Sequence, residues 1–289
     1  MANTNVKTSA APAAKEPTLA PDEVLRIDGL SIHFGGLKAV DNLSFAIKEK
    51  EIFGLIGPNG AGKTTVFNCI TQFYTPNAGS VLFRTNSGAV ENLVGKPVHT
   101  IIRKGLVRTF QNVELIPELS IIDNVLIGAH SDFKCGMFSQ ALKLPGARKE
   151  ERKMRQKAMD VLEFMGIADL SETPCGGLPY GIRKKVEMAR TLMCNPKLII
   201  LDEPAAGLND VETQQLAETI YQVRDKYHCT VLLVEHDMRL VMSICDRICA
   251  ISFGKFLACG TPAEIQQNKQ VQEAYLGVSE EAYEKEEKV

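Results

Sequence analysis

Apolar and polar positions alternate over the first part of the chain and merge into solid apolar runs further along. VLRIDGLSIHF, LSFAI and EIFGLIG, from Val24 to Ile56, are short strand-like runs separated by turns, one of them at Gly35-Gly36. KLIIL and TVLLV are continuously apolar, as strands covered on both faces are. Each is followed by a polar turn and a helical pattern. This order of strand and helix patterns along the chain predicts an α/β fold with a mostly parallel core sheet.

The remaining pattern fills in the elements around that sheet. Helices are predicted over Ala61–Phe73, Asp123–Ala129, about Glu151–Met165 and Val211–Tyr227, and strands over Ser80–Phe83, RICAIS and FLACG. The segment SDFKCGMFSQALKLPGARKEE has the composition of a looser basic insertion, with Pro145 and Gly146 at its centre. The basic segment from Arg148 to Lys157, which begins inside this insertion and continues beyond it, fits either a surface that touches lipid headgroups or one that faces water.

The stretch GIRKKVEMARTLM is predicted to be an amphipathic helix packed on the body of the protein. Its apolar stripe consists of Ile182, Val186, Ala189 and Met193, and the other faces carry Arg183, Lys184, Lys185 and Arg190. We interpret Lys184 and Lys185 as a solvated face. The glycine-rich start of this helix, GGLPYG, leaves free N–H groups and a positive dipole end, which together favour an anion.

Composition narrows the class of protein. The chain has 289 residues, 45% of them apolar, and a formal charge of -2, which gives no basic field for nucleic acid. Residues 1–20 have the composition of a disordered leader and 278–289 form a charged tail, so the folded domain is expected over 21–277. No apolar run approaches the roughly 18 residues needed to cross a bilayer.

Eight cysteines are scattered along the chain, most of them inside apolar runs. This placement favours reduced, buried thiols in a cytosolic protein. Cys245 and Cys249 are four residues apart in what looks like a helix, but a metal site there needs more ligands nearby.

The segment GPNGAGKT follows an apolar strand and precedes a helix, the context of a phosphate-binding loop. Its glycines let successive N–H groups point inward at phosphates. Lys63 is expected to reach the β- and γ-phosphates, and Thr64 to offer a hydroxyl to Mg²⁺. The candidate nucleotide-binding residues here are Gly57, Pro58, Asn59, Gly60, Ala61, Gly62, Lys63, Thr64 and Thr65.

KLIILDEP supplies two carboxylates at the end of a predicted strand. Asp202 is placed to hold Mg²⁺ opposite Thr64. Glu203, one residue further, is placed to take a proton from an attacking water. The pair indicates nucleotide hydrolysis. A GTPase is disfavoured because the single Asn-Lys pair, Asn268-Lys269, does not continue as a guanine-reading loop.

Several motifs together resemble the ABC-transporter ATPases, a family of P-loop NTPases. Gln111 follows RTF, GGLPYGIRKKVEMAR precedes KLIILDEP, and His236 follows TVLLVE, in the family's order with GPNGAGKT. The resemblance covers about Val24 to Gly277. It implies the family's architecture, in which an antiparallel β subdomain and a helical subdomain, here about 112–190, accompany the parallel core sheet. It also implies a pair of ATPase subunits, in which the helix start of one caps the γ-phosphate held by the other.

The resemblance assigns further roles by position. Gln111 would sense Mg²⁺ and the attacking water, His236 would contact the γ-phosphate, and Phe34 would stack on adenine unless it is an ordinary core residue. The stretch LPYGI, with Leu178, Pro179, Tyr180 and Gly181, stands where the family usually has LSGGQ. Pro179 removes a serine hydroxyl, whereas backbone N–H groups at Tyr180 and Gly181 remain. Asn209 stands where the family usually has an aspartate at the subunit contact.

FGGLKAVDNLSF, VRTFQNVELIPELSIIDNV, LDEPAAGLN, VEHDMRLVM and the ending YLG resemble the LivG-type subfamily of branched-chain amino acid importers. This resemblance implies a peripheral ATP- and Mg²⁺-dependent ATPase at the cytoplasmic face of the inner membrane. Its expected partners are a second ATPase (LivF-type, or a second copy), two membrane permeases and, indirectly, a periplasmic binding protein, with no nucleic acid.

Three alternatives stay open at this stage. In the first, the carried solute is another amino acid, an amide, urea or a lipid. In the second, the chain is a non-transport ABC protein that acts as a nucleotide-gated clamp. In the third, LPYGI no longer supports turnover and the partner alone hydrolyses ATP. The absence of a second ATPase module and of a long heptad run argues against the clamp.

Overall fold

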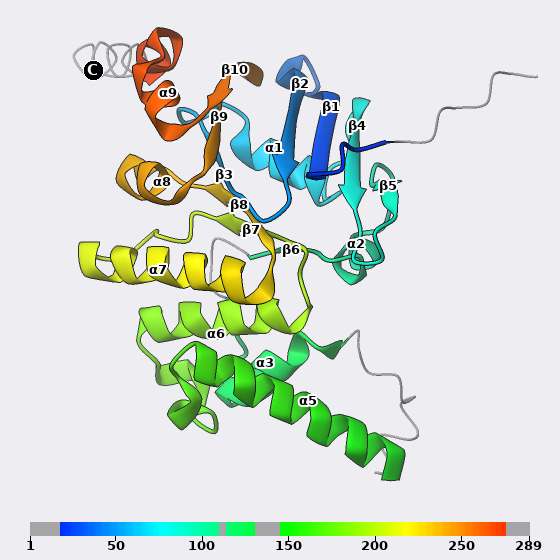
Figure 1. Ribbon diagram of the computed structural model, residues 1–289, viewed down its shortest axis with the longest axis vertical. Coiled ribbons are helices and arrows are strands. Elements are labelled where there is room, and N and C mark those ends of the chain that lie inside the picture. The colour runs from blue at the N-terminus through cyan, green and yellow to red at the C-terminus, as the bar shows by residue number, and fades with distance from the viewer. Residues whose placement is uncertain (1–17, 110–113, 131–144, 276–289) are drawn as a thin grey trace, which may run out of the picture.

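The computed structural model describes residues 18–109, 114–130 and 145–275 (Figure 1). The strands are β1 (Glu23–Phe34), β2 (Leu37–Lys48), β3 (Ile52–Ile56), β4 (Ala78–Arg84), β5 (Val90–Asn92), β6 (Leu106–Arg108), β7 (Leu198–Asp202), β8 (Thr230–Val234), β9 (Arg247–Ser252) and β10 (Lys255–Gly260). The helices are α1 (Lys63–Ile70), α2 (Val98–Arg103), α3 (Ile121–Ile127), α5 (Pro145–Phe164), α6 (Tyr180–Met193), α7 (Asp210–Tyr227), α8 (Met238–Ile244) and α9 (Pro262–Gln267).

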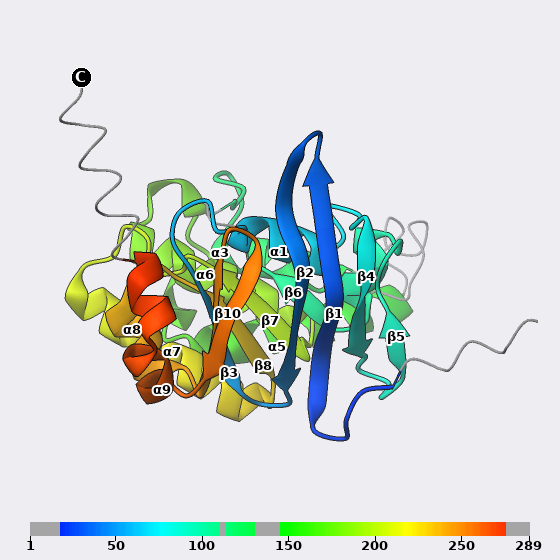
Figure 2. The same ribbon diagram turned by 90° about the horizontal axis from the view of Figure 1, so that it is seen from above.

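The strands form two sheets. The first is antiparallel with the order β2-β1-β4-β5. The second has the order β10-β9-β3-β8-β7-β6, in which β10 alone runs antiparallel to its neighbour. Figure 2 shows β1, β2, β4 and β5 as a separate layer across the face of the larger sheet. The predicted fold class, a mostly parallel core sheet with an antiparallel β layer, is confirmed.

The larger sheet is buried on both faces because its central strands β3, β8 and β7 are apolar at nearly every position. In β3, Ile52 and Ile56 point into a core shared with α3, α5, α6, α7 and α8. Phe53 and Leu55 alternate with them and point into a second core shared with α1 and the antiparallel sheet. This is the consequence of strand side chains alternating between faces. α1 and α6 therefore pack on opposite faces of one sheet (Figure 1).

Two predicted boundaries need correction. α1 is shorter than Ala61–Phe73 because it ends at Ile70 and Gln72 adopts a left-handed backbone with φ 60. The third predicted helix begins at Pro145, not near Glu151, so Pro145 and Gly146 start a helix and do not lie in a loose insertion. Proline fits there because the first turn of a helix needs no N–H from it.

The cysteine expectation is partly wrong as well. Cys245 follows the end of α8 in extended conformation, and Cys249 lies in β9, so the two do not share a helix. Within the described residues, no group of three or more His, Cys, Asp or Glu is arranged to hold a metal ion. The described cysteines are free thiols, and Cys69, Cys175 and Cys229 are fully buried, as their apolar surroundings predicted.

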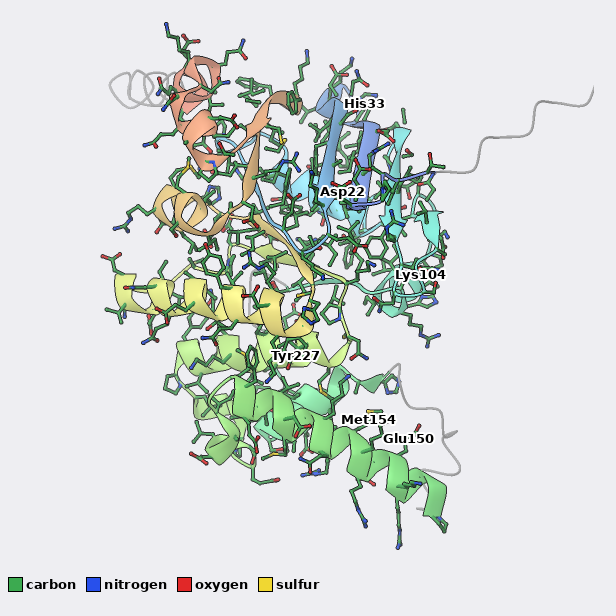
Figure 3. All side chains as sticks on the ribbon, viewed as in Figure 1. Asp22, His33, Lys104, Glu150, Met154 and Tyr227 are labelled. Atoms are coloured by element: carbon green, nitrogen blue, oxygen red, sulfur yellow. The ribbon has the colours of Figure 1, made fainter. Side chains whose placement is uncertain are left out.

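The helices between 121 and 193 gather below the sheets in Figure 1, where α3, α5 and α6 pack on one another. Figure 3 shows Glu150 and Met154 on α5 at the opposite end of the molecule from His33, which lies near the tip of β1. The predicted leader falls outside the described residues apart from 18–20, and the predicted tail falls outside them entirely. Ala20 already bonds to Arg84, whose Nη2 donates to its carbonyl at 2.7 Å.

Candidate functional site: a phosphate loop beside two strand ends

Three neighbouring parallel strands end at one edge of the larger sheet, and each is followed by a chemically active residue. β3 leads into the phosphate loop and Lys63, β7 ends at Asp202 and Glu203, and β8 leads to Glu235 and His236. Ligands of open α/β sheets bind beyond the carboxyl ends of such strands. The register fixes the arrangement, since Asp202 lies opposite Val234 and Leu55 lies opposite the same residue from the other side.

The phosphate loop is closely packed on the chain that follows β9. A Cβ on Gly57 would lie 2.2 Å from the Ile251 carbonyl oxygen, so only glycine fits there. Gly62, the residue before α1, has φ 101, and a Cβ on it would lie 2.6 Å from the Ala39 carbonyl oxygen. Gly254 donates its N–H to the Ala61 carbonyl at 2.9 Å. The loop is therefore held from two sides while α1 begins at Lys63.

Lys63 lies under this loop and is buried. Its Nζ donates to the carbonyl of Gly57 at 2.6 Å and to that of Pro58 at 3.1 Å. Burial lowers the pKa of Lys63, and the carboxylates of Glu203 and Asp202 partly offset that effect. The lysine thus lies close enough to both acids at the end of β7 for their charges to act on it. Thr64 is exposed in the first turn of α1, where a hydroxyl can reach a ligand.

Asp202 is nearly buried and forms an ion pair that the sequence analysis did not predict. Arg108, at the end of β6, donates from Nη2 to the Asp202 carboxylate at 2.6 Å and from Nη1 to Asn68 of α1 at 2.6 Å. Its guanidinium also lies 5.9 Å from the centre of the Phe67 ring. Arg108 thereby orients the carboxylate. Its only sequence signal is its place three residues before Gln111, because its partner is far along the chain.

Glu203 and His236 meet directly. His236 Nε2 lies 2.7 Å from Glu203 Oε1, and both side chains are accessible to solvent. Glu203 has φ 48, a left-handed conformation that is uncommon for a side-chain-bearing residue and that marks many functional positions. Its own N–H donates to the Val234 carbonyl at 2.9 Å, which fixes the turn at the end of β7 against β8.

Glu235 is a second residue that the sequence analysis missed. It is buried beneath His236 and accepts the N–H groups of Ala205 at 2.5 Å and His236 at 3.1 Å. Burial raises the pKa of Glu235, and these N–H donors lower it in part. Its carboxyl ties the turn after β7 to the turn after β8. Its signal in the sequence was only its position beside His236.

The start of α6 presents backbone N–H groups, as the glycine-rich sequence predicted. Pro179 is the residue before the helix, and no side chain caps it. The ring of Tyr180, 37% exposed, lies 5.7 Å from the Arg183 guanidinium and 5.0 Å from the Lys184 ammonium. Leu178 packs against the core and Gly181 is half-buried.

Lys184 is not the solvated charge that its pattern suggested. Its Nζ donates to the carbonyl of Pro204 and, at 3.0 Å, to that of Ala206, both in the turn after Glu203. Burial lowers the pKa of Lys184. The ammonium turns inward to these two carbonyls instead of outward, and it connects α6 to the turn after Glu203.

Three further predicted residues stand as follows. Phe34 is 46% exposed at the end of β1 and contacts Tyr74 edge to face at 5.3 Å, so it is not a core residue. Gln111 lies outside the described residues. Asn209 caps α7: its side chain accepts the Glu212 N–H at 2.9 Å in a capping box.

The sequence matches known proteins along most of its length. The profile of the family described as ABC transporter matches residues 40–206, and that of the branched-chain amino acid ATP-binding cassette transporter matches 257–281. The chain belongs to the ABC transporter family. Its ATP-binding cassette hydrolyses ATP, with the phosphate loop, Glu203 and His236 on one sheet edge.

Individual relatives share most of this cassette. The chain is 45% identical over 254 residues to the high-affinity branched-chain amino acid transport ATP-binding protein LivG of Salmonella typhimurium, covering 88% of this chain and 98% of that protein. It is 44% identical over 254 residues to BraF of Pseudomonas aeruginosa, a protein with the same description. A crystal structure of an ATP-binding cassette in its ADP conformation superposes with a TM-score of 0.75 at 30% identity, over 88% of this chain and 99% of that one.

None of the helices in the described ranges combines the length and the apolar character that crossing a membrane requires.

Proposed function

We propose that this ABC ATPase drives an importer of branched-chain amino acids from the cytoplasmic face of the membrane. The observation that carries the proposal is the Glu203–His236 pair beside the phosphate loop, in a chain 45% identical to a LivG protein over almost the whole of both. The solute would bind elsewhere in the importer, so this chain's task is to hydrolyse ATP and to move against its partners.

Each residue has a task in hydrolysis. Lys63 and the N–H groups of the phosphate loop hold the phosphates of ATP. Glu203 takes a proton from the attacking water, and His236, 2.7 Å away, fixes the direction of that carboxylate and approaches the terminal phosphate. Phe34 offers an exposed ring for adenine to stack on.

The donors present fit Mg²⁺. This ion prefers oxygen ligands and is usually held by one or two carboxylates together with substrate phosphates and water. Asp202 and the Thr64 hydroxyl provide such a set, and Gln111 is the third expected contact. The ion would neutralise developing charge on the phosphates. Arg108 holds the Asp202 carboxylate in place through an ion pair of 2.6 Å.

A second ATPase subunit, LivF-type or another copy, would complete the site. The N–H groups of Tyr180 and Gly181 at the start of α6 would face the terminal phosphate held by the partner. Because α6 and α1 pack on opposite faces of the sheet, the start of α6 and the phosphate loop belong to different surfaces of one chain.

A hollow of about 440 Å³ between α2, α3 and α6 is the proposed seat for a membrane permease. Ile102 and Ile127, both exposed, lie in its wall together with Arg103 and His130. Such an apolar wall with a basic rim suits a short amphipathic segment of a partner. Arg108 also lines it, so a movement of this segment would reach Asp202 through one side chain.

Uptake by membrane vesicles tests the proposal. Vesicles containing this chain, the second ATPase, both permeases and the binding protein should take up leucine, isoleucine or valine when ATP is supplied inside. Uptake of an amide or urea alone would reassign the solute. Recovery of ribosomes or DNA with this chain from gently solubilised membranes, without permeases, would instead support a nucleotide-gated clamp.

A further inference from the structure

Two cysteines face each other across the hairpin of β9 and β10, outside the nucleotide site. Cys259 lies directly opposite Cys249 in the antiparallel register. Directly opposed residues of such a pair have Cα atoms about 4.5–5.5 Å apart, and a disulfide spans about 4.4–6.8 Å. The register therefore brings the two cysteines within the Cα spacing of a disulfide. Both thiols are free in the structure.

The two thiols have unequal surroundings. Cys249 is fully buried, whereas Cys259, on the edge strand β10, is partly exposed. Arg247 lies two residues before Cys249 and on the same face of β9, and its Nη2 donates to Cys259 Sγ at 3.4 Å. One cysteine is thus partly exposed with its sulfur next to a cation, and the other is buried.

The electrostatics follow from these contacts. The Cys249 thiol and the Arg247 guanidinium donate to the Cys259 sulfur and lower the pKa of Cys259, while the nearby Glu51 carboxylate and burial oppose them. The same hydrogen bond and burial raise the pKa of Cys249. A thiolate at the exposed position and a protonated thiol behind it are the starting arrangement of a reactive and a resolving cysteine.

We propose that Cys259 and Cys249 form a peroxide-reactive dithiol that closes reversibly into a cross-strand disulfide. The Cys259 thiolate attacks one oxygen of a hydroperoxide; an S–O bond forms, the O–O bond breaks, and the leaving oxygen departs as water or an alcohol after taking a proton. Cys259 becomes a sulfenic acid. The Cys249 sulfur then attacks Cys259; the S–S bond forms, the S–O bond breaks, and the hydroxyl leaves as water with the Cys249 proton. A dithiol reductant reverses the change.

The position of the hairpin gives the reaction a structural context. The turn between the two strands donates the Gly254 N–H to the Ala61 carbonyl, and Ile251 of β9 packs against Gly57. The dithiol therefore belongs to the hairpin that supports the phosphate loop. A second partly buried cysteine, Cys194, differs in its contact: its thiol donates to the Gly128 carbonyl at 3.2 Å, which stabilises the protonated form. It is the matched internal control.

Peptide mapping tests the proposal because Lys255 lies between the two cysteines. The reduced full chain is treated with hydrogen peroxide, alkylated with N-ethylmaleimide and digested with trypsin. The reduced form yields two separate alkylated peptides, whereas the oxidised form stays joined and is about 2 Da lighter than the sum of the unmodified peptides. Dithiothreitol should restore the separate peptides. Cys194 should remain alkylated at peroxide concentrations that join the other two.

Three substitutions sharpen the result. Cys259→Ser should abolish the joined peptide and leave Cys249 reduced. Cys249→Ser should stop the reaction at a sulfenic acid on Cys259, which dimedone traps. Arg247→Gln should slow the oxidation of Cys259 roughly tenfold at neutral pH because less thiolate is present. Oxidation of Cys194 before Cys259, or a joined peptide that forms equally fast in a folded Arg247→Gln chain, would overturn the proposal.

Discussion

At the scale of single residues, the site combines a small number of side chains proposed to act in ATP hydrolysis with others that position them. Glu203 has a left-handed backbone and contacts His236, which directs its carboxylate although it is not deeply buried. Glu235 and Arg108 are positioning residues. Glu235 holds the turn after β7, and Arg108 holds the Asp202 carboxylate. The residues proposed to act in hydrolysis are therefore different from the residues that position them.

Glu203→Gln is expected to lower the ATP turnover of the assembled transporter by about 10²–10⁴-fold while ATP still binds. The amide keeps the shape and the contact to His236 but cannot accept a proton from water. Phosphate release and nucleotide binding are measured on the same preparation. Glu218→Gln, on the exposed side of α7, is the control and should turn over normally. Unchanged turnover in the Glu203 variant would remove that residue from the role of base.

At the scale of elements, sequence patterns predicted the parts whose signals are local. The apolar runs of β3, β7 and β8 and the motifs that follow them placed Lys63, Glu203 and His236 on one sheet edge, because parallel strands end together. Arg108 and Lys184 could not be predicted in this way. Their partners, Asp202 and the Pro204 carbonyl, lie on other elements, and a single arginine or lysine on a strand or helix resembles any surface charge until the fold is known.

The same limit explains the boundaries that were wrong. The segment before Glu151 contains proline and glycine, which usually mark a loop, yet a proline in the first turn is compatible with a helix. Cys245 and Cys249 have helix-like spacing, but the parallel strand β9 must return to the sheet immediately after α8. Contacts with the rest of the fold therefore determine the conformation of such short segments.

Lys184→Met tests the connection between α6 and the turn after Glu203. The substitution keeps the apolar stem but leaves the carbonyls of Pro204 and Ala206 without their charged donor, so the free energy of unfolding should fall by about 1–3 kcal/mol. Chemical denaturation measures it. Lys185→Met, one residue along the same helix, should change it by less than about 0.5 kcal/mol. Equal losses in both variants would show that the connection does not stabilise the fold.

At the scale of the whole molecule, the two anion-binding features of the chain do not belong to one surface. The phosphate loop starts α1 over one core, and the glycine-rich start of α6 lies over the other. LPYGI lacks the serine hydroxyl that the family usually supplies. Its backbone N–H groups are therefore the groups left to attract a phosphate. A chain built in this way needs a partner to bring the two kinds of site together.

The purified chain alone should therefore hydrolyse ATP slowly, and co-expression with the second ATPase should raise turnover about 10²-fold, the effect of supplying one missing set of N–H donors to a developing anion. Turnover is measured at several concentrations of the chain.

If the chain pairs with itself, the specific activity rises with its concentration and the second ATPase adds nothing. If turnover neither responds to concentration nor to the second ATPase, the nucleotide is not shared between subunits, and the start of α6 must have another use. Performing the co-expression with Glu203→Gln separates the contributions of the two sites, because the activity that persists then comes from the partner's own carboxylate.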